Sequence, residues 1–364
     1  MTTPLETKMA EVAAATIRPE TDLGTRSEFP RQIWQTLGQA GLLDPDAAAS
    51  AGASHCLSIA RAARILVSEG GNLGLALSWM IHHLVAGRLV WPLLGRAPWA
   101  DDLRNRVKTG DATICLAVSE PDAGAHPKFM SARAEETSGG FSITGNKTYL
   151  TNGPIADFYA VVAITGEAEG RKAFSSFLVD RETTGMEVSS PMSIGFFKPS
   201  PHGSIAMNGC EVGKERLLGK EGEAFPTLVL PFRHLEDAVM TGPVTGAMIF
   251  INTAIAEQMV NHSLRSPENL EALGQLNVLT DTAVFLSDRI AIGVDQADDT
   301  EPLVLYFRQM AAQYLTAVND LIAATAICLD NPAAVMLTDL HASVKLGKTV
   351  AGLKLQKIGH KVLR

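Results

Sequence analysis

The stretch ICLAVSEPDAG, residues 114–124, passes from five largely apolar residues into a short polar turn. An apolar run of this length is typical of a buried strand. Ser119, Pro121 and Gly124 then supply a hydroxyl, a stiff turn residue and a residue that tolerates positive φ. Such a junction can place backbone N–H groups and a hydroxyl against a ligand, but an ordinary strand-to-loop junction has the same composition. The choice between these two interpretations depends on the rest of the chain.

Length and charge limit the classes of protein to which this chain can belong. Its 364 residues are enough for two or three domains with sizeable cores. A net charge of −8 argues against nucleic acid or an anionic membrane as the main partner. The four cysteines are scattered and form no C-x-x-C pair, which favours reduced thiols and gives no support for a metal site. Residues 1–20 lack the apolar segment of a signal peptide, so we expect a cytoplasmic protein.

The most apolar window, Leu73–Leu94, is interrupted by His82, His83 and Arg88. A buried helix is therefore a better interpretation than a membrane span. Adjacent residues on a helix point about 100° apart, so the two histidines cannot share a metal ion. We expect one of them at the edge of a core and the other at an interface.

The period of the apolar residues changes twice along the chain, which predicts three domains. Residues 1–111 have helical spacing, residues 112–219 have short alternating runs, and residues 220–364 return to helical spacing. The middle runs are separated by glycine, proline and charged turns, which is typical of an antiparallel barrel or sandwich of about a hundred residues. The expected strands are residues 132–136, 140–144, 158–165, 174–180 and 204–207.

The last domain is predicted to be a four-helix bundle. Its four long helical patterns are residues 235–262, 277–295, 303–329 and 333–357. The predicted fold is therefore of the α+β class, with a helical domain, a central antiparallel β-barrel or sandwich and a C-terminal bundle, in that order.

Two motifs of the middle domain make this layout specific. Residues 117–124, AVSEPDAG, resemble the A-x-T/S-E-P-x-A-G signature of the acyl-CoA dehydrogenase flavoprotein family, and residues 143–153, ITGNKTYLTNG, resemble its L-N-G-x-K-x-W-I-T-N-G motif. Residues 215–225 resemble the segment that joins the β domain to the bundle, and residues 356–359 resemble the start of the family's Q-x-x-G-G-x-G. The similarity runs from about residue 25 to the last residue.

The resemblance implies an FAD cofactor whose flavin ring lies against the two β-domain motifs. It assigns a hydrogen bond from the Thr151 hydroxyl to flavin N5 and an aromatic face beside the ring to Tyr149, which takes the place of a tryptophan. Backbone groups of the 116–119 strand and the Ser119 hydroxyl would bind the pyrimidine edge and stabilise the reduced anion. The full set of cofactor residues implied in this way is Leu116, Val118, Ser119, Gly124, Tyr149, Thr151, Gln356 and Gly359.

Desaturation of a thioester needs a base for the weakly acidic α-proton, and burial makes a carboxylate more basic. In many members of the family this glutamate follows the Q-x-x-G-G-x-G motif, but the sequence stops at Arg364, eight residues past Gln356, so we expect the base elsewhere. In the isovaleryl and long-chain types it lies on the first bundle helix, ten residues before a glycine. Glu236 and Gly246 have this spacing here, so the resemblance implies Glu236 as the catalytic base. A solvated glutamate near the start of a helix is the alternative interpretation.

Several positions depart from the family pattern. Asp237 replaces the usual arginine and puts a second negative charge beside Glu236, Ala125-His126 replaces Ser-Asp, and His360 replaces the second glycine of Q-x-x-G-G. No R-x-x-F-G follows the first bundle helix, where Arg265 is nearby but lacks the Phe-Gly. In the family, this region and the Q-x-x-G-G region help to hold the FAD pyrophosphate and adenosine, partly from a neighbouring subunit.

The resemblance implies FAD-dependent α,β-desaturation of an acyl-CoA or acyl-carrier thioester, with the α-proton passing to a glutamate and the β-hydride to flavin N5. The expected partners are the thioester and an electron-transfer flavoprotein or similar acceptor, and the expected assembly is a homodimer or homotetramer. Two alternatives stay open: a flavin oxidase or monooxygenase of the same fold, and a catalytically degenerate homologue that acts as a binding subunit.

Overall fold

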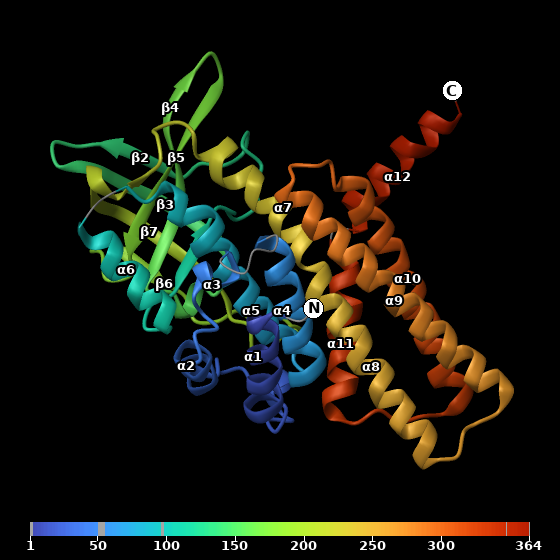
Figure 1. Cartoon of the computed structure of the whole chain (residues 1–364). Coiled ribbons are helices and arrows are strands. Elements are labelled where there is room, and N and C mark those ends of the chain that lie inside the picture. Colours follow the sequence, from blue (N-terminus) through green and yellow to red (C-terminus); the bar gives the residue numbers. More distant parts are fainter. Residues whose placement is uncertain (1–2, 50–54, 96–97, 347, 364) are drawn as a thin grey trace.

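The computed structural model describes residues 3–49, 55–95, 98–346 and 348–363. Three parts follow one another along the chain: a group of N-terminal helices, a β-sheet and a set of long C-terminal helices (Figure 1). The N-terminal helices lie between the sheet and the long helices, so the molecule has a helical centre with the sheet on one side and the bundle on the other. The predicted α+β class and the order of its parts are confirmed.

The N-terminal part is built around α4, whose side chains are buried along most of its length. Helix α1 begins with a capping box, in which the Thr3 hydroxyl accepts from the backbone N–H of Glu6 and the Glu6 carboxylate accepts from that of Thr3. Helix α5 begins at the N-cap Asn72. The helices of this part are α1 (Pro4–Val12), α2 (Arg31–Gln39), α3 (Pro45–Ala49), α4 (His55–Gly70), α5 (Leu73–His83) and α6 (Pro98–Thr109).

The sheet has eight strands in the order β6-β7-β3-β2-β4-β5-β8, with β1 paired to β4. Its pairs are antiparallel except for β1 with β4 and a single contact of β2 with β4. Alternate residues of β1 face different cores: Cys115 and Ala117 pack inside the sheet, whereas Ile114 and Leu116 pack with the helices. The strands are β1 (Ile114–Ala117), β2 (Arg133–Glu136), β3 (Gly140–Thr151), β4 (Phe158–Ala168), β5 (Arg171–Asp180), β6 (Met186–Val188), β7 (His202–Gly213) and β8 (Leu217–Leu218).

Helices α8 to α11 form the predicted bundle, but two of the predicted helices are interrupted. The expected helix 235–262 breaks at Met240, because Pro243 has no N–H with which to continue the hydrogen-bond ladder. The expected helix 333–357 breaks at Leu346, whose backbone is extended (ψ 128°). The helices of this part are α7 (Leu230–Val239), α8 (Thr241–Asn261), α9 (Pro267–Asp295), α10 (Glu301–Thr325), α11 (Asn331–Lys345) and α12 (Lys348–Val362).

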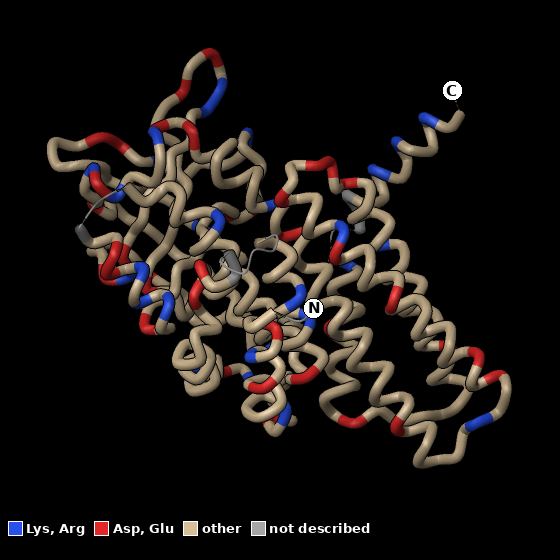
Figure 2. Tube along the Cα trace, viewed as in Figure 1, with Lys and Arg blue, Asp and Glu red and all other residues tan. Residues whose placement is uncertain are grey.

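The break after α11 releases the last helix from the bundle. Helix α12 points away from the rest of the molecule at the C-terminal end (Figure 1), and its charged residues are all basic (Figure 2). One ion pair, Lys354 Nζ to Glu301 Oε1 at 2.7 Å, joins α12 to the start of α10.

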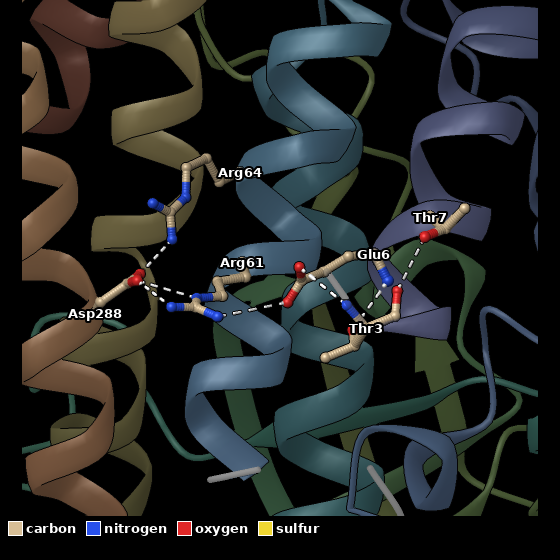
Figure 3. A network of polar contacts seen from close by, with 6 residues as sticks. All are labelled: Thr3, Glu6, Thr7, Arg61, Arg64 and Asp288. Atoms are coloured by element: carbon tan, nitrogen blue, oxygen red, sulfur yellow. Dashed lines mark hydrogen bonds and ion pairs between the residues drawn. The ribbon is translucent and has the colours of Figure 1, made fainter. Parts of the chain in front are cut away.

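Helices α4 and α8 approach so closely that two glycines are required between them. A Cβ at Gly242 would lie 2.2 Å from the carbonyl oxygen of Ala60, and one at Gly246 would lie 2.4 Å from that of Arg64. The same region carries an ion-pair network, in which Asp288 of α9 accepts from both Arg61 and Arg64 of α4 (Figure 3). Because α7 leads directly into α8, this packing fixes the position of α7.

His82 and His83 are both fully buried, so the expectation of one core-edge and one interface histidine is wrong. Their Nε2 atoms lie 3.0 Å from the carbonyl oxygens of Leu43 and Leu42, whose turn covers both rings. Within the described ranges no group of three His, Cys, Asp or Glu side chains is arranged to hold a metal ion. Two helical segments, Leu73–Leu93 and Phe225–Asn261, have the length and apolarity of a membrane span, but 89% and 78% of their most apolar windows are buried inside the molecule.

Candidate active site

The two motifs of the middle domain lie side by side in the structure. The backbone N–H of Thr148 donates to the carbonyl oxygen of Ser119 at 2.8 Å, and the Lys147 ammonium donates to that of Val118 at 3.0 Å. The end of β1 and the second half of β3 are thereby fixed to each other. The turn after β1 is closed by two hydrogen bonds between Glu120 and Gly124, and Gly124 has φ +55°, which favours glycine.

A buried ion pair joins these motifs. Lys147 Nζ lies 2.9 Å from Glu120 Oε1, and the side chains are 0% and 3% exposed. The Glu120 carboxylate also accepts from the Ser131 backbone N–H and hydroxyl and from the Ala132 N–H. Burial works to raise the pKa of Glu120, but the charge of Lys147 and these hydrogen bonds outweigh it and hold that pKa below its usual range. The sequence contains both charges inside its motifs, and we did not predict their pairing.

The backbone around Thr151 is shaped by two residues in the left-handed region. Tyr149 has φ +56° and Asn152 has φ +63°, and the pairing of β3 with β7 shifts register between Lys147 and Leu150. Tyr149 is thereby turned outward and is 67% exposed, whereas Asn152 is buried and donates to the Ser78 carbonyl oxygen at 2.9 Å. Thr151 lies between them at the end of the strand.

Thr151 and Glu236 line the same cavity, which has a volume of about 500 Å³. Its walls come from the end of β3, the start of β7, the loop before β7 and helices α5, α7, α8, α10 and α11. Most of its lining is apolar, including Leu77, Ile194, Phe196, Val244 and Phe307. The fold therefore brings two of the predicted site residues, which are far apart in the sequence, to one apolar cavity.

Glu236 is the half-buried carboxylate of this cavity. It forms no hydrogen bond or ion pair with the residues that the structure describes. Burial, with a smaller effect of the neighbouring Asp237 charge, raises its pKa to about 7. A carboxylate with this pKa is a stronger base than a solvated glutamate and can exchange a proton near neutral pH.

The second negative charge of α7 is compensated by α10. Arg308 Nη2 lies 2.9 Å from Asp237 Oδ1, and its Nη1 donates to the carbonyl oxygen of Leu346 at 2.7 Å. Asp237 and Arg308 both line the cavity. The guanidinium therefore joins α7, α10 and the end of α11, and it offsets the charge that Asp237 places beside Glu236. The sequence offered no signal for this pairing, because it depends on how the bundle packs.

The loop before β7, residues 189–201, forms one wall of the cavity. Buried Asp339 of α11 accepts from the backbone N–H of Phe197 at 2.8 Å, and Asn72 of α5 donates to the carbonyl oxygen of Lys198 at 3.2 Å. Ser200 and Ser78 share a hydrogen bond of 2.9 Å. Three helical side chains thus hold this loop, and none of them was singled out from the sequence.

The remaining predicted cofactor residues lie in two places. Leu116 and Val118 are buried and Ser119 is half-buried, next to the motif that carries Thr151. Gln356 and Gly359 are exposed on α12, and neither lines the cavity. Within one chain the structure brings together the residues predicted for the flavin ring, but not those predicted for the FAD tail.

Comparison with known proteins finds similarity to acyl-CoA dehydrogenases. Residues 115–208 match the family model "Acyl-CoA dehydrogenase, middle domain". Isovaleryl-CoA dehydrogenase from Arabidopsis thaliana is 26% identical over 211 residues, which are 56% of this chain and 50% of that protein. The matched part is therefore about half the length of this relative.

Solved structures show the same fold over the whole chain. Butyryl-CoA dehydrogenase from Megasphaera elsdenii superimposes with a TM-score of 0.81 at 15% identity, covering 100% of this chain and 99% of that one. A structure described as "PigA with FAD and proline" gives a TM-score of 0.80 at 17% identity, covering 97% and 96%.

The helical, β and bundle parts, with a carboxylate from α7 facing the end of β3, define the class of acyl-CoA dehydrogenase-like folds. Residues 115–208 match the middle domain of the acyl-CoA dehydrogenase family, and the chain resembles that family in its two β-domain motifs.

Proposed function

We propose that this protein is an FAD-dependent dehydrogenase that desaturates an acyl thioester, with Glu236 as its base. The single observation that carries the proposal is the meeting of Glu236 and Thr151 in one apolar cavity. In the reaction, Glu236 takes the α-proton, and when bound the cofactor supplies the hydride acceptor at N5.

The residues of the cavity suit the removal of a weakly acidic proton. The apolar walls exclude water, which strengthens the base and prevents competing protonation. Because the Glu236 carboxylate has no partner among the described residues, it can approach a substrate carbon without first breaking a hydrogen bond. Arg308 keeps the adjacent Asp237 paired, so that Asp237 does not compete for the same proton.

The ring end of the site fits a flavin. The Thr151 hydroxyl lines the cavity and is not used in a hydrogen bond within the described chain, so it is free to donate to N5. Leu116, Val118 and Ser119 would hold the pyrimidine edge, and Tyr149 would lie beside the ring. The Lys147–Glu120 pair keeps these two segments in register and takes no direct part in the chemistry.

The residues predicted to hold the pyrophosphate and adenosine of FAD could do so only if a second subunit contributes them. Gln356 and Gly359 lie on the projecting helix α12, away from the cavity. A homodimer or homotetramer would let α12 reach a neighbouring subunit, and we include this assembly in the proposal. Its substrate would be a CoA or carrier-protein thioester, its electron acceptor an electron-transfer flavoprotein or similar carrier, and its location the cytoplasm.

The test is an anaerobic titration of the FAD-bound protein with acyl thioesters, followed by the loss of flavin absorbance. The wild-type protein is expected to bleach, and Glu236→Gln to bleach about 100- to 10,000-fold more slowly. Glu271→Gln, on the exposed face of α9, is the matched control and should bleach at the wild-type rate.

Three results would contradict the proposal. Failure to reconstitute the protein with FAD would favour the alternative of a catalytically degenerate homologue that acts as a binding subunit. A flavin that ignores thioesters but, once reduced chemically, reacts rapidly with oxygen would favour an oxidase or monooxygenase. Equal bleaching by wild type and Glu236→Gln would remove Glu236 as the base.

A further inference from the structure

His202 lies at the same end of the cavity as Thr151. It is the first residue of β7, it is the cross-strand partner of Thr151, and its ring lines the cavity. The backbone around it is held from two sides, because Asn152 N–H donates to the carbonyl oxygen of Pro201 at 2.8 Å and Met192 N–H donates to that of His202 at 2.7 Å. The position of the ring is therefore set by the sheet and by the loop before β7.

One hydrogen bond determines which ring nitrogen carries the proton. His202 Nδ1 lies 3.1 Å from the carbonyl oxygen of Ser200, which can only accept, so Nδ1 carries the hydrogen. Burial lowers the pKa of His202, which keeps the ring neutral at pH 7. Nε2 then has a lone pair, and it makes no hydrogen bond with any residue that the structure describes. His202 Nε2 is therefore a hydrogen-bond acceptor next to Thr151 that has no partner among the described residues.

Two other hydroxyls of the cavity are accounted for: that of Thr241 donates to the carbonyl oxygen of Ala238 at 2.6 Å, and that of Thr151 is assigned to flavin N5 in the proposed function. No hydrogen bond joins Nε2 to any described side chain of the cavity. Asp237 and Arg308 are paired with each other, and the Ser343 hydroxyl donates to the carbonyl oxygen of Leu340 at 2.7 Å. Glu236 has only acceptor atoms when ionised. Around these groups the walls are apolar. If a hydrocarbon group covers Nε2, the acceptor loses water and gains no partner, which costs free energy.

We propose that His202 is a specificity-determining residue that selects acyl groups with an N–H or O–H donor on, or next to, the carbon that lies beside Thr151. Acyl groups of the same shape that carry a methyl or methylene in place of the donor would bind less well. This inference rests on the proposed function, because it takes the acyl group to occupy the cavity between Thr151 and Glu236.

A pair of matched thioesters tests the inference. The 3-hydroxybutanoyl and 3-methylbutanoyl thioesters of pantetheine differ only by a hydroxyl in place of a methyl on the β-carbon. Their dissociation constants are measured with the FAD-bound protein by equilibrium dialysis, and their rates of anaerobic flavin reduction are measured separately. The preference is the dissociation constant of the methyl thioester divided by that of the hydroxyl thioester. This ratio is expected to be about tenfold larger for wild type than for His202→Phe.

Two further variants separate recognition from general damage. His202→Gln keeps an acceptor atom and should retain most of the preference, whereas His202→Phe should lose it. Ser343→Ala removes a cavity hydroxyl that is already used within its own helix, so the ratio of the two affinities should not change.

The inference is overturned if wild type binds both thioesters equally or prefers the methyl member, or if His202→Phe keeps the preference for the hydroxyl member. Binding and reduction by both thioesters without a preference would overturn this inference and leave the proposed function standing. The absence of binding and of flavin reduction with either thioester would overturn both.

Discussion

Lys147 of β3 and Glu120 of the turn after β1 form an ion pair of 2.9 Å that is shielded from solvent on both sides. The pair joins the two segments that carry the predicted flavin contacts. Neither side chain lines the cavity of Thr151 and Glu236, so the role of the pair is to hold the strand and the turn in register. The Ser119–Thr148 backbone hydrogen bond runs beside it.

Replacement of Lys147 by methionine should destabilise the fold by about 3–5 kcal/mol, because Glu120 would be left buried and unpaired. Urea denaturation followed by circular dichroism measures this change. The double variant Lys147→Met with Glu120→Gln should recover part of the loss, because it removes the unpaired charge. Lys214→Met, which breaks the exposed pair with Glu136, is the control and should leave the denaturation midpoint unchanged. A wild-type midpoint for Lys147→Met would contradict the structural role of the pair.

The pKa of Glu236 makes stability depend on pH in a defined direction. Folding raises this pKa from 4.5 to about 7, so the folded protein binds the proton more tightly than the unfolded chain does. The resulting stabilisation is fully present below pH 4.5 and is lost as the pH rises to 7. Glu236→Gln should therefore become more stable relative to wild type across this window, by about 2 kcal/mol. Denaturation midpoints of both proteins at several pH values measure the difference, and a constant difference would contradict the burial of the charge.

Asp237 and Arg308 should shift the titration of Glu236 in opposite directions. Asp237→Asn removes a nearby negative charge and should lower the pKa of Glu236, whereas Arg308→Gln leaves Asp237 uncompensated and should raise it. Arg308→Lys keeps the charge and should stay near wild type. The pH dependence of flavin reduction reports the shift in the pKa of Glu236. The other titratable groups that line the cavity, His202 and Tyr149, are the same in all of these variants. Shifts of the same sign in both variants would show that the ion pair does not act through charge.

Gly246 allows the close approach of α8 to α4, so Gly246→Ala should destabilise the protein by about 1–3 kcal/mol. The added methyl would overlap the Arg64 carbonyl oxygen and push the two helices apart. Gly352→Ala on α12 is the matched control, because a Cβ there meets nothing within 4 Å. It should be neutral or slightly stabilising, since alanine favours a helix. Thermal denaturation measures both changes, and equal effects would contradict close packing as the reason for Gly246.

The sequence by itself determined the class of fold, the order of its three parts and the identity of the two β-domain motifs. Helical and strand periods are properties of neighbouring residues, and so are the turn residues that separate the strands. The break at Met240 has a local signal in Pro243, which the prediction of one continuous helix over residues 235–262 overlooked. The full burial of His82 and His83 depends instead on how distant segments pack, so no local pattern reveals it.

Only the tertiary structure decided how the site is assembled. It brought Glu236 of α7 to the cavity of Thr151, paired Asp237 with Arg308, and placed His202 beside Thr151 through the pairing of β3 with β7. It also kept Gln356 and Gly359 out of that cavity, on a helix that leaves the bundle. Each of these relationships joins residues far apart along the chain, so it is fixed by the packing of helices on the sheet and not by any local pattern.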